Sequence, residues 1–195
     1  MWPDEQIVQV VPSVLAYHAP LVDEVPTAGV AYWLPPGAAP VVSGTEDRVR
    51  PVIAALRAGG VRARKAGRAG TGELGAAQQM PYVAALEIAS WSLPTLRVGL
   101  SLPASAAGEA VAVVAALSSR KPPRVAPPWL VGAALRLLPR LAPFDLPRYL
   151  EAHFTKLAAQ TREMLDGWIS EGESCGLPVA RLKELRQALP PVVPR

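Results

Sequence analysis

The chain has 195 residues, half of them apolar, which suffices for one sizeable core or two small ones and excludes a disordered chain. Its net charge of +4 is spread along the sequence apart from two short basic clusters, so we expect a solvated surface and no nucleic-acid partner. The single cysteine, Cys175, excludes an internal disulfide and a cysteine-built zinc site, which fits a reducing cytoplasm. No basic and apolar leader opens the sequence, so we expect no secretory signal.

The first third of the chain is predicted to contain short strands. Residues 6–17 form a β-branched run, and residues 29–37 and 39–44 are short apolar runs bounded by proline and glycine. Pro12 cannot donate to a sheet ladder, so it argues against a central strand there or for a bulge.

Residues 45–60 are predicted to form a helix, with Thr45 as its N-cap, acidic residues in its first turn and two glycines at its end. Pro51 interrupts this pattern, so we expect the regular helix to begin near Arg50. The alternating residues 61–66 predict one more strand.

After Gly75 the pattern becomes helical. The predicted helices cover residues 76–92, 104–118, 129–141, 146–174 and 178–189. The glycine-rich stretch 67–75 separates the two patterns. We therefore predict an α+β chain, with a small strand and helix piece over residues 1–68 followed by an all-α helical domain over residues 69–195. Residues 98–119 carry one charge, but they are mostly Ala, Gly and Ser around a proline, which predicts a buried helix and no membrane span.

The helix expected over residues 146–174 has the clearest amphipathic pattern. At about 100° per residue its apolar side chains, together with one threonine, share a stripe about 100° wide: Leu150, Phe154, Leu157, Thr161, Met164, Leu165 and Trp168. A polar stripe lies beside it: His153, Lys156, Gln160 and Glu163. Thr161 has two interpretations: its hydroxyl bonds the carbonyl four residues earlier, or it borders a cleft with Gln160 and His153.

Gly70, Gly72 and Gly75 have the spacing of a dinucleotide-binding fingerprint. That motif needs a buried strand before it, and residues 61–69 are too basic for a central parallel strand. It also needs a second strand that ends in an acidic residue, and the candidate over residues 95–103 has none. We therefore interpret these glycines as a hinge or a turn leading into a helix.

Other signals of chemistry are sparse. His18 and His153 have no ligand spacing that predicts a metal site. Glu87 stands in a helix that is otherwise almost wholly apolar, so it must face a solvated groove, pair with an arginine or line a ligand site.

The order of these segments resembles a known family. "IVQVVPSVLAY" with the run over residues 29–44 looks like a strand pair, "EDRVRPVIAALRAGGVRARKA" like a helix and strand, and "GELGAAQQMPYVAALEIASW" like the first substrate-domain helix. "TREMLDGWISEGESCGLPVARLKEL" resembles the family's closing acidic, Asn-Gly and Gly-Leu-Pro pattern. Together they resemble the second half of ketopantoate reductase-like proteins, in the 6-phosphogluconate dehydrogenase-like helical group. The resemblance implies NADP-dependent reduction of a 2-keto acid.

The sequence departs from that family at the residues that matter most. The catalytic lysine and the two asparagines that follow it would fall near Gln79, Val83 and Glu87. A glutamine cannot provide the ammonium group of the lysine. The substrate-binding carboxylate would fall near Thr161, and the later Asp and Asn positions near Glu163 and Asp166.

Three hypotheses follow from these observations. In the first, the chain is the substrate half of a reductase, or a degenerate homologue, that binds no cofactor alone and meets NADP only through a partner chain. In the second, it is a non-catalytic module that binds a small organic acid or forms a homodimer. In the third, Glu87, His153, Lys156 and Gln160 act together as an independent active site.

Overall fold

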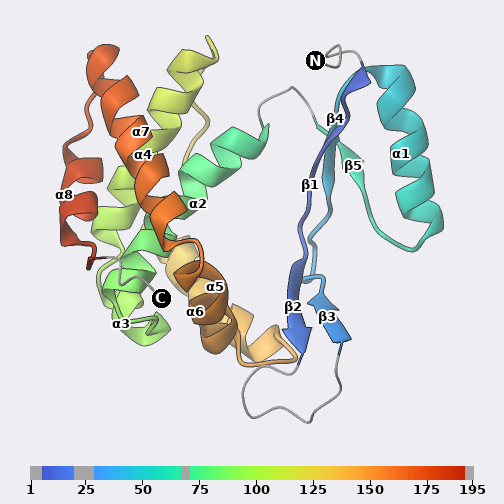
Figure 1. The fold of residues 1–195 in the computed structure, drawn as a ribbon, viewed down its shortest axis with the longest axis horizontal. Helices are drawn as coiled ribbons and strands as arrows, with labels where there is room; N and C mark the ends of the chain where they lie inside the picture. The colour runs from blue at the N-terminus through green and yellow to red at the C-terminus, as the bar shows by residue number, and fades with distance from the viewer. Residues whose placement is uncertain (1–5, 20–28, 67–70, 192–195) are drawn as a thin grey trace. The chain divides into compact units, whose positions relative to one another are not determined.

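A computed structural model describes residues 6–19, 29–66 and 71–191 of the chain (Figure 1). It divides into two compact units, Met1–Gly72 and Glu73–Arg195. Strands and one helix come first in the chain and seven helices follow, so the predicted α+β layout is confirmed for the described residues. The boundary predicted after residue 68 falls at 67–70, which lies outside the described residues.

The first unit contains two small sheets. In one, β4 forms the centre, antiparallel to β1 and parallel to β5; in the other, β2 and β3 form an antiparallel pair. The strands are β1 (Gln9–Val11), β2 (Leu15–Ala19), β3 (Gly29–Trp33), β4 (Val41–Ser43) and β5 (Arg64–Lys65). Pro12 lies between β1 and β2 and is in neither ladder, as its missing N–H requires.

Helix α1 (Glu46–Ala58) connects β4 to β5 and packs against both strands, which makes a β–α–β unit (Figure 1). Val42, Val49 and Ala63 form its small buried core. The expectation that the helix begins near Arg50 is wrong. It begins at Glu46, and Pro51 lies inside it. A proline within a helix removes one backbone hydrogen bond, and the packing of α1 against β4 and β5 stabilises the helix in spite of that loss.

The second unit is built from α2 to α8. Their bounds are α2 (Thr71–Ile88), α3 (Leu93–Val98), α4 (Ser101–Leu117), α5 (Pro128–Leu141), α6 (Leu146–Thr155), α7 (Ala158–Ser174) and α8 (Ala180–Ala188). Helix α2 begins earlier than predicted, and it includes Gly72 and Gly75. These two glycines are helical, so they form no loop around a phosphate. Gly70 lies outside the described residues.

Two sequence-based expectations for this unit are wrong. The strand candidate over residues 95–103 is helix α3 followed by the start of α4. Ser92 caps α3, since its hydroxyl accepts a hydrogen bond from the Thr95 N–H at 3.3 Å. The single helix expected over residues 146–174 is two helices, α6 and α7. It breaks at Lys156 and Leu157, where the Leu157 N–H bonds the Phe154 carbonyl in a tighter turn.

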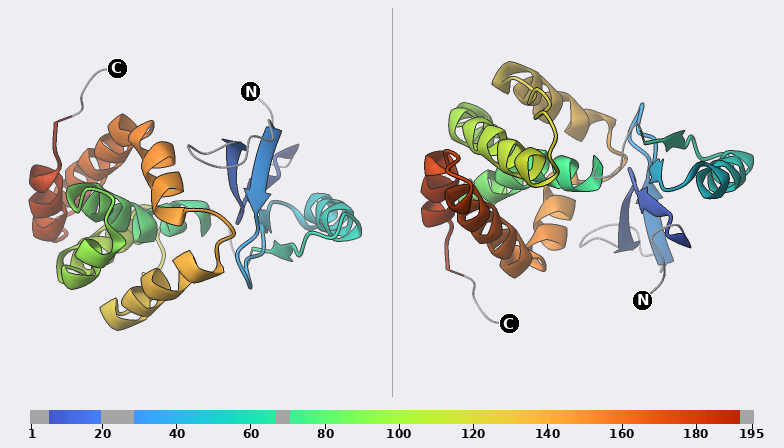
Figure 2. Two further views of the ribbon diagram at one scale, coloured as in Figure 1. Left: turned by 90° about the horizontal axis from the view of Figure 1, so that it is seen from below. Right: turned by 90° about the horizontal axis from the view of Figure 1, so that it is seen from above.

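Helix α4 supplies much of the core of the second unit. It packs against α7 and α8, and α7 also packs against α8 (Figure 2). Its buried residues are one proline and otherwise only alanines and valines, small side chains that allow neighbouring helices to approach closely. Its one charged residue, Glu109, accepts hydrogen bonds from the N–H groups of Arg181 and Leu182 at the start of α8. Those N–H groups have no partner within their own helix, so Glu109 caps α8 from another helix.

In the described part of the chain, no helix combines the length and the apolar character needed to cross a membrane. The apolar segment that includes α4 is a buried helix, as predicted.

Candidate functional site

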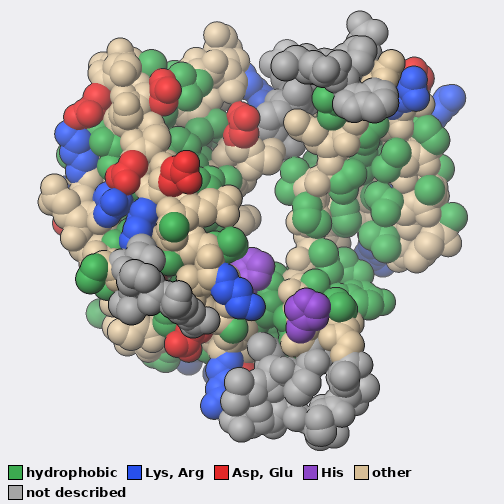
Figure 3. Space-filling view, in the orientation of Figure 1, with side chains coloured by type: hydrophobic (Ala, Val, Ile, Leu, Met, Phe, Trp, Pro, Cys, Tyr) green, Lys and Arg blue, Asp and Glu red, His purple; other side chains and the backbone are tan. Residues whose placement is uncertain are grey.

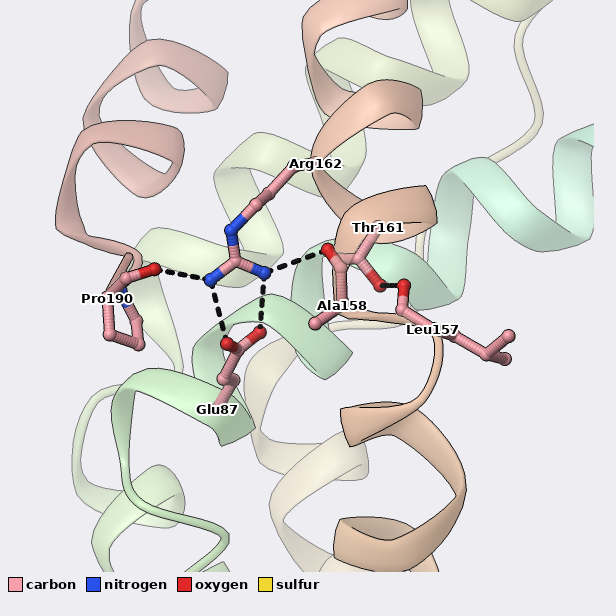
Figure 4. A network of polar contacts seen from close by, with 6 residues as sticks. All are labelled: Glu87, Leu157, Ala158, Thr161, Arg162 and Pro190. Carbon is pink, nitrogen blue, oxygen red and sulfur yellow. Dashed lines mark hydrogen bonds and ion pairs between the residues drawn. The ribbon is translucent and has the colours of Figure 1, made fainter. Parts of the chain in front are cut away.

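The most enclosed polar cluster of the second unit joins Glu87 on α2 to Arg162 on α7 (Figure 4). The Glu87 carboxylate accepts from both terminal nitrogens of the guanidinium, with Oε1 at 2.7 Å from Nη2 and Oε2 at 3.2 Å from Nη1. The two side chains are only 13% and 9% exposed, respectively. A paired, two-bond geometry of this kind is the strongest arrangement of an arginine and a carboxylate.

Arg162 also bonds two backbone carbonyls. Its Nη1 donates to Ala158 at 2.8 Å, and its Nη2 donates to Pro190 at 2.5 Å, beyond the end of α8 (Figure 4). The guanidinium therefore links α2, α7 and the segment after α8. Because all these partners are satisfied within the protein, the cluster is a structural junction, and neither charge is free to meet a ligand.

The predicted site residue Glu87 thus has the arginine partner that was one of its interpretations. The partner itself was not predicted. Arg162 lies three residues before the buried Leu165 on the same side of α7, so its side chain must run into the core. The sequence contained one signal of this buried arginine, which is a single basic residue beside the apolar stripe.

Thr161 is buried, and its hydroxyl donates to the carbonyl of Leu157 at 3.2 Å. This is the local bond to the preceding turn that was one of its two interpretations. The other interpretation, that Thr161 borders a cleft, is wrong, because only 2% of the residue is exposed.

The predicted polar stripe is solvent-exposed throughout: His153 on α6, Lys156 at the break, and Gln160 and Glu163 on α7. Within the described residues, none of the four donates a hydrogen bond to Glu87, whose partner is Arg162. No hydrogen bond therefore joins Glu87 to this stripe, and the shared cleft expected for Glu87, His153, Lys156 and Gln160 stays a prediction.

His153 packs on two aromatic rings of its own helix. Its ring stacks on Tyr149 with centroids 5.5 Å apart and meets the edge of Phe154 at 4.9 Å. Desolvation of the ring by its neighbours, and then the nearby Lys156 charge, lower the pKa of His153 below its usual value, although the side chain still reaches solvent. The folded state therefore favours the neutral ring, and this contribution to stability is lost as the pH falls below the unfolded-state pKa of a histidine.

Gln79, the other predicted catalytic residue, is exposed on α2. It lies eight residues before Glu87, about 12 Å along the helix axis at 1.5 Å per residue. No hydrogen bond of the described residues joins the two side chains, and their shared catalytic role stays a prediction.

The outer surface of α7 and α8 carries charges of both signs. Arg186 holds the Asp166 carboxylate through two bonds of 2.9 and 3.0 Å, and Lys183 pairs with Glu173. Figure 3 shows Lys and Arg side chains among Asp and Glu side chains on the visible face of this unit. That face therefore presents no field of a single sign. In the described part of the chain, no three His, Cys, Asp or Glu side chains group closely enough to hold a metal ion.

Comparison of the chain with protein-family models, curated proteins and solved structures yields no match. The resemblance to ketopantoate reductase-like proteins therefore stays a prediction that rests on the sequence motifs.

Proposed function

We propose that the chain is a degenerate, ketopantoate reductase-like substrate-domain protein, in which an ion pair stands where the family carries out its chemistry. The order of elements supports this proposal, since β4, α1 and β5 precede a helical unit as the resemblance implies. The contact between α2 and α7 also supports it, since these are the helices that the resemblance assigns to the substrate site.

The single observation that carries the proposal is the Glu87–Arg162 pair. The resemblance puts Glu87 at the second asparagine after the catalytic lysine, and here its carboxylate is held by a guanidinium at 2.7 Å. An arginine keeps its proton too firmly to act as a general acid, and the exposed amide of Gln79 has no acidic proton to give. In this proposal NADP is held by a partner chain, and this chain does not reduce a 2-keto acid alone.

The first prediction concerns the isolated chain. Mixed with NADPH and a panel of 2-keto acids, it is expected to leave the NADPH absorbance unchanged and to show no nucleotide-dependent shift in melting temperature. Oxidation of NADPH in proportion to chain concentration, and its loss in Glu87→Gln, would contradict the proposal.

The partner is tested by reconstitution. The candidate to test is any chain encoded beside this one that has a Gly-x-Gly-x-x-Gly turn after a buried strand, the signature of a dinucleotide fold. The mixture is expected to co-elute on size exclusion and, when a 2-keto acid is present to accept the hydride and the partner chain donates the proton, to oxidise NADPH, with each chain alone as the control. If the mixture neither co-elutes nor oxidises NADPH, the partner-chain role is wrong.

A second candidate function, homodimerisation, is favoured by helix α5, which contributes no buried residue to the described structure. Three of its leucines are 44–54% exposed and share one stripe: Leu130, Leu137 and Leu141. An apolar stripe of this kind is typical of a contact with another protein surface. Because a two-fold dimer uses the same patch on both chains, one substitution alters both sides of the interface.

The corresponding prediction is that the chain sediments as a dimer at micromolar concentration and that Leu137→Glu converts it to a monomer. The matched control is Gln187→Glu on α8, where an exposed neutral residue gains the same single negative charge. A wild-type chain that sediments as a monomer at every concentration tested excludes this function.

A further inference from the structure

A pocket of about 530 Å³ opens where the end of α3, the start of α4 and the first half of α5 meet. Its volume is within the range of sites for small molecules. None of its lining residues belongs to α2 or α7, so it is separate from the Glu87–Arg162 junction.

The charge of this pocket has one sign. Arg97 and Arg136 line it, and there is no acidic residue among the lining side chains. Within the described residues, neither guanidinium forms an ion pair. Two exposed arginines on one pocket repel each other, and an anion between them removes that repulsion.

The backbone adds to this field. Ser101, at the start of the 17-residue helix α4, and Pro128, at the start of the 14-residue helix α5, both line the pocket. Pro128 has no N–H group, so the N–H groups without a partner in their own helix are those of Ser101 on α4 and Trp129 on α5, and the helix dipole is positive at that end. Both helix starts therefore favour the same sign of ligand as the two arginines.

The apolar part of the wall is unusually exposed. Val98 is 91% exposed and Trp129 is 72% exposed, more than any other large apolar side chain described in this unit. Exposed apolar surface rimmed by charges is typical of a binding site. An indole face offers a flat ligand both contact area and stacking.

The pocket does not overlap with the leucine stripe of α5. At about 100° per residue, the α5 residues that line the pocket centre about 130° away from Leu130, Leu137 and Leu141. The third side of α5 faces the core through Val131 and Leu135. Ligand binding and self-association can therefore be altered independently.

We propose that this pocket binds a small organic anion with a flat apolar body, an aromatic carboxylate being the class that fits best. The carboxylate pairs with Arg97 and Arg136, since a planar guanidinium matches a carboxylate through two parallel bonds. The ring of the ligand lies against Trp129 and Val98. The inference is independent of the reductase proposal, because it uses none of the residues that the resemblance assigns.

The test is isothermal titration of the full chain with benzoate and phenylpyruvate, with benzamide as the uncharged analogue and phenyl phosphate as the phosphate arm. We expect a carboxylate to bind and benzamide to bind at least about tenfold more weakly, since a charge-assisted hydrogen bond exceeds a neutral one by that order. Tighter binding of phenyl phosphate than of benzoate assigns the pocket to phosphate esters and overturns the carboxylate class.

The variants locate the site. Arg97→Gln and Arg136→Gln should each weaken binding by roughly tenfold to a hundredfold, and Trp129→Ala by roughly tenfold. The matched control is Arg140→Gln, which removes the same charge from the same helix outside the pocket. All four residues are exposed, so we expect the variants to keep the wild-type circular dichroism. The inference is wrong if no anion binds at millimolar concentration, or if Arg140→Gln weakens binding as much as the two pocket variants.

Discussion

Replacing Arg162 with alanine is expected to lower the free energy of unfolding by about 3–5 kcal/mol, because it leaves a buried charge without its partner. The Glu87 carboxylate is only 13% exposed, and both its oxygens are bonded by Arg162. The same change removes the donors that reach the carbonyls of Ala158 and Pro190. Urea unfolding followed by circular dichroism at pH 7 measures the effect.

The size of that effect depends on the Glu87 carboxylate that is left buried without a partner, and two further variants test this. Glu87→Gln leaves the Arg162 charge without a counter-ion, but the guanidinium keeps an amide acceptor and the carbonyls of Ala158 and Pro190, so this variant should cost less than Arg162→Ala. The double variant Glu87→Leu with Arg162→Met removes both charges and should recover much of the loss, since apolar replacement of a buried pair is often close to neutral. A double variant as unstable as Arg162→Ala would contradict this explanation.

The chain offers a matched control in another arginine. Arg186 on α8 also binds a carboxylate of α7 through two bonds, but Asp166 is 53% exposed. An exposed pair contributes at most about 1 kcal/mol. Arg186→Ala should therefore be well tolerated, and a loss equal to that of Arg162→Ala would show that burial is not the cause.

The sequence was most informative where one residue contradicted its surroundings. An arginine partner was one of three interpretations of Glu87, a local bond was one of two interpretations of Thr161, and these are the ones that match the structure. Each rests on the cost of an unsatisfied buried polar group, which depends little on the rest of the fold. The same argument could not name Arg162, because the partner is 75 residues away along the chain.

The errors occurred where tertiary packing overrides local signals. The break between α6 and α7 has no proline or glycine to mark it, so an unbroken period of 3.6 residues predicted a single helix. The residues of α3 include Val98 and a short apolar run that fits a strand equally well. The pocket was not predicted at all, because Arg97 and Arg136 are brought together only by the packing of α3 against α5.

The close approach of α7 to its neighbours gives the second large prediction, at Gly172. A Cβ added there would clash with Cγ1 of Val179 and would lie 2.9 Å from Cγ2 of Val113. Both contacts are below any ordinary van der Waals distance, and a β-branched side chain is too stiff to move aside easily. Gly172→Ala should therefore lower the free energy of unfolding by about 1–3 kcal/mol, although alanine is the better helix former.

Gly167 is the control within the same helix. It is exposed, and an added Cβ there would meet nothing within 4 Å. Gly167→Ala should therefore raise the free energy of unfolding by about 0.5–1 kcal/mol through helix propensity alone. If Gly172→Ala lowers the free energy of unfolding and Gly167→Ala raises it, the loss arises from the contact with Val113 and Val179. The double variant Gly172→Ala with Val179→Ala should regain part of the loss, because it removes the closer clash. If Gly172→Ala alone stabilises the protein, then α4, α7 and α8 can move apart at this point and the prediction is wrong.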